Sequence, residues 1–96
     1  NDLEVRNDIG NLWENFLVAE RLKKQSYQQI YSNNYFWRTW NQKEVDWVEE
    51  REGKLFGYEF KWHKKRSKAL KAWKENYPEA SLEIISRENY LPFVKE

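Results

Sequence analysis

The chain has 96 residues, of which 40% are hydrophobic and 18% aromatic, so it holds enough apolar bulk for one compact core. Charged residues make up 34% of the chain and no run of 18 apolar residues occurs, which excludes a membrane span. Cysteine is absent and histidine occurs once, which excludes disulfides and thiolate-held zinc and argues against a His-based zinc site or a Ser-His-Asp triad. Without a signal-peptide pattern, the sequence predicts a soluble, cytoplasmic protein.

The first predicted element is a helix over residues 8–30. Asp8 has the chemistry of an N-cap, and apolar residues recur at three- and four-residue spacing from Ile9 to Leu17. Glu20 continues this spacing, so we expect it inside the apolar stripe. There it pairs with Arg38 or a lysine, or it serves as a secondary acid at a functional site.

Three strands, a second helix and a fourth strand are predicted to follow. The strands are expected at 35–40, 44–50 and 54–62, with turns at 41–42 and 51–54. The second helix is expected at 67–77, where Pro78 ends it, and the last strand at 81–86. The predicted order is therefore α-β-β-β-α-β, and the tail from Asn89 has no clear period.

The central hairpin brings acidic residues together in this prediction. If Glu52 and Gly53 form a two-residue loop, Asp46 lies opposite Glu59 and Glu44 lies opposite Lys61. Side-chain alternation then places Asp46, Glu59 and Lys61 on one face. The opposite face carries an apolar set suited to packing on a helix, namely Val45, Trp47, Tyr58, Phe60 and Trp62. A three-residue turn would instead shift the register by one residue.

Two opposed carboxylates favour a cation between them, because like charges across a sheet destabilise it by up to about 1 kcal/mol. Asp46 and Glu59 are therefore candidate ligands of Mg²⁺ or Mn²⁺. Lys61 is the candidate catalytic residue that orients an attacking water and stabilises charge on a phosphate. The alternative is an ordinary solvated sheet face with a Glu44–Lys61 ion pair.

A basic segment follows the hairpin. The candidate residues for binding a nucleic-acid backbone are His63, Lys64, Lys65, Arg66 and Lys68. The alternative is a solvated basic face that acidic residues elsewhere balance, since the net charge is only +1. His63 is expected to be exposed and without a catalytic role.

The segments VD at 45–46 and YEFK at 58–61 resemble the signature of the PD-(D/E)XK nuclease superfamily, and Gly10 to Glu14 is similar to its GxxxE helix motif. More closely, residues 8 to 90 look like the DUF4143 domain. The resemblance implies a restriction-endonuclease-like α/β core, with a mixed sheet flanked by helices, over the single domain 1–96. It also implies a supporting catalytic acid at Glu14 beside the roles above. Val45 departs from the superfamily pattern, which has proline there.

The resemblance also implies an AAA+ ATPase module in the same full-length chain. Because the sequence starts at Asn1 without a methionine, we expect a C-terminal fragment of such a protein. The expected function is metal-dependent hydrolysis of DNA. The alternative is a catalytically silent nuclease-like module that binds nucleic acid, docks the ATPase or forms a homodimer.

Overall fold

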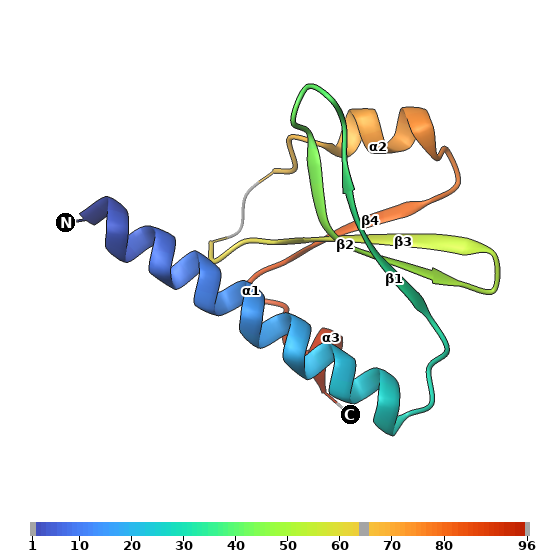
Figure 1. The fold of residues 1–96 in the computed structure, drawn as a ribbon, viewed down its shortest axis with the longest axis horizontal. Helices are drawn as coiled ribbons and strands as arrows, with labels where there is room; N and C mark the ends of the chain where they lie inside the picture. Colours follow the sequence, from blue (N-terminus) through green and yellow to red (C-terminus); the bar gives the residue numbers. More distant parts are fainter. Residues whose placement is uncertain (1, 64–65, 96) are drawn as a thin grey trace. The chain divides into compact units, whose positions relative to one another are not determined.

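The computed structural model describes residues 2–63 and 66–95, and these fall into two compact units. The helical unit contains residues 2–30, 60–63 and 85–95. The sheet unit contains residues 31–59 and 66–84. Figure 1 shows the elements in chain order. Each unit has its own buried side chains, so each is described by itself.

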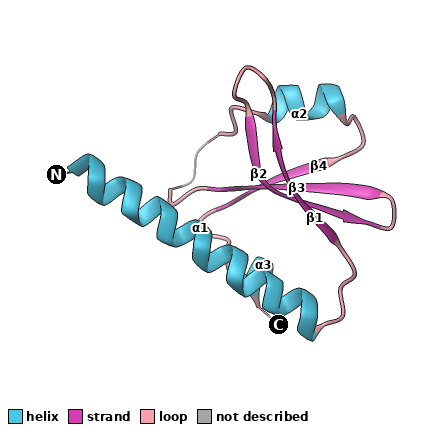
Figure 2. Ribbon diagram, viewed as in Figure 1, coloured by secondary structure: helices cyan, strands magenta, loops and turns pink. Residues whose placement is uncertain are grey.

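The sheet unit is built on four strands in the order β1-β2-β3-β4. Their bounds are β1 Asn33–Arg38, β2 Glu44–Arg51, β3 Lys54–Phe60 and β4 Ser81–Ile85. Neighbouring strands from β1 to β3 are antiparallel, and α2 (Leu70–Asn76) connects β3 to β4. Figure 2 shows β4 running in the same direction as its neighbour β3, so the sheet is mixed. The last residues of β3 and β4 belong to the helical unit. The predicted mixed α/β class and the order of elements along the chain, α-β-β-β-α-β, are confirmed, and a short helix follows β4.

The helices differ in their bounds from those predicted, and one of them was not predicted. Helix α1 spans Asp2–Tyr27, so Asp8 lies inside the helix and is not its N-cap. Helix α2 begins at Leu70 and ends before Pro78, while Ser67 accepts a hydrogen bond from the N–H of Ala69. A short helix in the tail, α3 (Leu91–Val94), has Pro92 in its first turn, where a missing N–H costs nothing.

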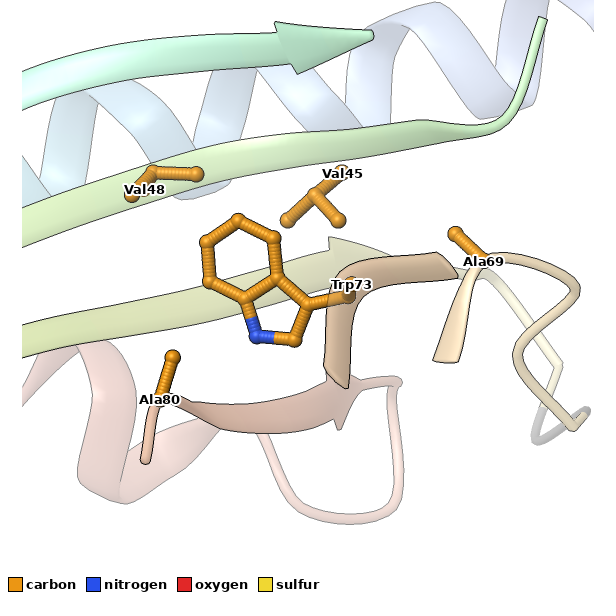
Figure 3. Close-up of a cluster of buried hydrophobic side chains, with 5 residues drawn as sticks. All are labelled: Val45, Val48, Ala69, Trp73 and Ala80. Atoms are coloured by element: carbon orange, nitrogen blue, oxygen red, sulfur yellow. The ribbon is translucent and has the colours of Figure 1, made fainter. Parts of the chain in front are cut away.

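Trp73 of α2 is the centre of the sheet unit's core. Its indole is fully buried and lies between Val45 and Val48 of β2 on one side and Ala80 on the other (Figure 3). The indole Nε1 donates to the carbonyl of Ser81 at 2.9 Å, so the buried polar atom is satisfied. This seat fixes α2 against one face of the sheet.

Gly57 allows the close approach of Trp73 to β3. A Cβ atom at this position would lie 3.1 Å from two carbons of the Trp73 ring and 3.1 Å from Leu82 Cδ1. Glycine is therefore favoured here, because any Cβ would force the ring or Leu82 to shift by a few tenths of an ångström.

The helical unit joins α1 to the C-terminal segment. Trp13 makes edge-to-face contacts with Trp62 and Tyr90, each with 5.3 Å between ring centroids. Buried Arg21 donates from Nη1 to the carbonyl of Phe93 at 2.8 Å, and Lys24 donates to the carbonyl of Pro92. Two cations thus bind carbonyls of α3, which have no intrahelical partner.

Several residues that were predicted to be buried or to lie in a strand are found elsewhere. Leu12 and Phe16 of α1 are exposed, and Trp40, predicted to end a strand, lies in the turn after β1 with 95% of its surface exposed. The buried face of α1 instead runs through Trp13, Leu17 and Arg21. Among the described residues, no helix combines the length and apolar character needed to cross a membrane.

Candidate functional site

The β2–β3 hairpin has the register predicted from its turn. Arg51 pairs with Lys54 across a two-residue loop of Glu52 and Gly53, both with positive φ, at 53° and 77°. Such loops match the twist of the flanking strands. The alternative three-residue turn is therefore excluded, and the pairing runs regularly from the loop to Trp47↔Tyr58.

Asp46 and Glu59 are the next residues beyond the last of these pairs. Continuing the same register by one residue sets the backbone of Asp46 opposite that of Glu59. Asp46 is half-buried and Glu59 is only 4% exposed. Glu59 is thus not part of a solvated sheet face, which removes the simplest structural alternative for this carboxylate.

A β-bulge lies in β2 at Asp46. Between the pairs Tyr35↔Val48 and Trp37↔Val45, β1 contributes only Phe36, whereas β2 contributes both Asp46 and Trp47. The extra residue brings Val45 and Val48 into the same core, although regular alternation would put residues three apart on opposite faces. Val45 was predicted to share a face with Trp47 and Tyr58. That prediction is wrong because of the bulge.

The two hairpin faces are consequently organised differently from the prediction. The face that includes Leu55 and Gly57 receives α2 and its Trp73. Glu59 follows Gly57 by two residues and so shares its side of β3. The helix-covered face of the sheet unit is therefore the Glu59 side and not the predicted apolar side.

The other face of the hairpin contains a buried acid that the sequence analysis did not single out. Glu49 is fully buried, and its carboxylate accepts a hydrogen bond from Trp47 Nε1 at 2.9 Å and lies 3.2 Å from Arg51 Nε. Arg51 also donates to the Tyr58 hydroxyl at 3.1 Å and lies over the Phe56 ring at 3.8 Å. The sequence offers one indication of this network. Trp47, Glu49 and Arg51 are two residues apart on one strand, so their side chains share a face. This network stabilises the two strands that carry Asp46 and Glu59.

The other predicted catalytic residues belong to the helical unit. Lys61 directly follows β3, is half-buried, and its N–H donates to the carbonyl of Ile85 at 2.9 Å. Glu14 is half-buried on α1 beside Trp13. Glu20 forms an ion pair with Lys23 at 3.4 Å and is partly exposed, so pairing with a lysine is confirmed but a place in the core is not. Arg38 pairs with Glu44 at 2.5 Å.

The described part of the predicted basic segment is exposed. His63 lies in the helical unit, and Arg66 and Lys68 lie in the sheet unit. Lys64 and Lys65 lie outside the described residues. These exposed cations have the chemistry that contacts phosphates.

The donor set tests whether a divalent ion fits the hairpin. Among the side chains that the structure describes, those of residues 10–63 and 66–95, no group of three or more His, Asp or Glu gathers in metal-binding geometry. A site at Asp46 and Glu59 would offer two carboxylates, which is the protein contribution common at Mg²⁺ sites, where water and phosphate oxygens complete the shell. The donor chemistry fits Mg²⁺ or Mn²⁺ and does not fit a structural zinc site.

The fold therefore defines a mixed α/β domain. Its hairpin carries two acidic residues on adjacent strands, beside a β-bulge. The family DUF4143, described as a domain of unknown function, matches residues 9–93, and the chain belongs to this family. No curated protein and no solved structure matches the chain.

Proposed function

We propose that the domain is a nuclease that hydrolyses phosphodiester bonds of DNA with Mg²⁺ or Mn²⁺. The observation that carries the proposal is the hairpin register, because the residues next beyond the pair Trp47↔Tyr58 are half-buried Asp46, at a β-bulge, and buried Glu59. Bulges are frequent beside active sites, where they redirect a side chain. Asp46 and Glu59 would hold the ion, which when bound lowers the pKa of water and neutralises phosphate charge.

The protein's own groups have separate tasks in this proposal. The Lys61 ammonium group, two residues beyond Glu59, would orient the attacking water and stabilise negative charge on the phosphate oxygens. Glu14 would accept a hydrogen bond from a second water. Arg66 and Lys68, both exposed, would hold the nucleic-acid backbone together with the remaining basic segment. The similarity to PD-(D/E)XK nucleases supports these assignments.

A thermal-shift titration with Mg²⁺ and Mn²⁺ tests the ion site. We expect a metal-dependent rise in Tm for the wild type that is lost in Asp46→Asn and in Glu59→Gln. Glu49→Gln is the matched control, because it removes a buried hairpin carboxylate on the other face. Its Tm should fall without metal, but the metal-dependent rise should persist. An equal rise in the wild type and in both site variants would contradict the ion site.

Cleavage of plasmid, single-stranded and branched DNA tests the activity. We expect cleavage only with a divalent ion, and we expect Asp46→Asn and Lys61→Ala to reduce its rate by at least about 100-fold. A folded wild type that cleaves no DNA form would count against the enzyme.

A second candidate is a catalytically silent module that binds nucleic acid or docks a protein. The observation that favours it is that no third Asp, Glu or His side chain among the described residues joins the hairpin pair as a ligand group. This candidate predicts DNA binding that is unchanged in Asp46→Asn and is independent of divalent ions.

A further inference from the structure

Strand β1 is an edge strand whose outer side is open. The sheet order places β1 at one end, with β2 on its inner side. No other strand in the described ranges 2–63 and 66–95 pairs with it. An open edge presents backbone N–H and C=O groups that can pair with another extended segment. The natural occupant of this edge is therefore a strand.

The open edge is flanked by exposed aromatic side chains. Tyr35 is 51% exposed, Phe36 57% and Trp40 95%, and Tyr31 just before the strand is 86% exposed. Natural sheets usually protect an open edge with a charged residue or a proline near its middle, and β1 has aromatic residues there instead. Exposed aromatic side chains beside an open edge are typical of a protein-binding surface.

The charge of this surface favours a protein over a nucleic acid. Arg38 is the only charged residue in β1, and its guanidinium group pairs with Glu44 and lies 5.5 Å from the Phe36 ring centroid. A phosphate backbone therefore finds little uncompensated positive charge here. Antiparallel pairing of two β1 strands would also keep the two Arg38 residues at opposite ends and bring each near the Asn33–Asn34 end of its partner.

We propose that a second copy of this chain occupies the edge, with two β1 strands pairing antiparallel about a two-fold axis. Tyr35 and Phe36 lie within β1, whereas Tyr31 and Trp40 flank it, so strand pairing covers only part of the exposed aromatic surface. The buried area then stays below the roughly 1,200 Å² in total of a stable specific interface. Dimerisation is then weak and depends on protein concentration. This proposal does not depend on nuclease activity.

Sedimentation equilibrium or light scattering across about 1 to 500 µM tests the dimer, because a small interface associates in this range. We expect the mean mass of the wild type to rise toward twice the chain mass, and Phe36→Lys and Trp40→Lys to remain monomeric. Leu70→Lys is the matched control, because Leu70 is exposed to a similar degree on α2. A wild type that stays monomeric throughout, or a control that loses as much association, overturns the proposal.

Because the chain contains no cysteine, single cysteines can locate the pairing. In an antiparallel two-fold pair, one residue meets its own copy with Cα atoms about 4.5–5.5 Å apart, which suits a disulfide. We expect one of Asn34→Cys, Tyr35→Cys and Phe36→Cys to form an intermolecular disulfide much faster than Leu70→Cys. Equal rates in all four variants overturn the proposal. The proposal is also overturned if Phe36→Lys still associates to the mean mass of the wild type but no longer binds single-stranded DNA.

Discussion

At the scale of single residues, Gly57 determines how closely α2 approaches the sheet. Trp73 cannot move away easily, because its ring is fully buried, its Nε1 is hydrogen-bonded to Ser81, and Trp37 packs edge-to-face against it at 5.2 Å. An added methyl group on β3 therefore meets a rigid ring.

We predict that Gly57→Ala lowers the free energy of unfolding by about 1–3 kcal/mol, because the new Cβ overpacks the Trp73 seat. Chemical denaturation measures the change. The control is Gly10→Ala, which lies in α1 with no atom within 4 Å of its Cβ. It should stabilise the protein by about 0.5–1 kcal/mol through helix propensity. A neutral Gly57→Ala would show that the ring adapts.

The hairpin register could be predicted from the sequence, because Glu52-Gly53 can form only a small number of turns between two alternating strands. The side of the sheet on which Val45 packs could not be predicted. It depends on the bulge, and the bulge arises from pairing with Phe36 on a strand that the hairpin pattern does not contain. The same bulge includes Asp46, so the direction of this candidate ligand's side chain could not be predicted from simple alternation along the strand.

At the scale of elements, α3 is held by side chains of α1. Arg21 contributes a buried hydrogen bond to Phe93 and a cation–π contact, with its guanidinium carbon 4.5 Å from the ring centroid. Lys24 adds a bond to Pro92. A helix of four residues has too few internal bonds to form alone, so these contacts supply much of its stability.

We predict that Arg21→Met lowers the free energy of unfolding by about 1.5–3 kcal/mol, because the carbonyl of Phe93 loses a charged donor while apolar volume is kept. Hydrogen exchange of the Lys95 amide, which bonds to the carbonyl of Leu91, should also become faster. Lys23→Met is the control, since its ion pair with Glu20 is exposed and should change stability by less than about 0.5 kcal/mol. Equal effects would contradict a specific role of Arg21.

The strands and α2 were predictable because their apolar residues and breakers follow regular periods, as Pro78 after α2 does. Helix α3 was not, because its apolar residues are too few to show a period and its stability comes from contacts distant in sequence. Helix α2 begins later than predicted for a local reason. Neither Ser67 nor Lys68 adds an apolar contact, and Ala69 begins the buried face.

At the scale of the whole molecule, 17 basic residues nearly balance 16 acidic ones. A net charge of +1 gives little general attraction to nucleic acid, so any binding must depend on local clusters. Arg66 and Lys68 are exposed members of the one such cluster that the sequence analysis identified.

We predict that the double substitution Arg66→Gln and Lys68→Gln weakens DNA binding and lowers the slope of log K against log salt by about two units. Fluorescence anisotropy at several salt concentrations measures the slope. The control pair is Lys23→Gln with Lys54→Gln, which removes two exposed cations elsewhere and should leave the slope within error. Equal slopes for both pairs would point to nonspecific attraction.

Among the described residues, Trp37 meets Trp73 edge-to-face in the sheet unit, and Trp13 meets Trp62 in the same way in the helical unit. Indoles this close couple their electronic transitions, so each pair contributes to the far-ultraviolet circular-dichroism signal, and phenylalanine substitution of Trp37 or of Trp62 would remove the contribution of that pair. The contribution of each pair is the difference between the spectra of the wild type and of the variant. A melting experiment can therefore follow the loss of tryptophan packing in either unit without an added dye.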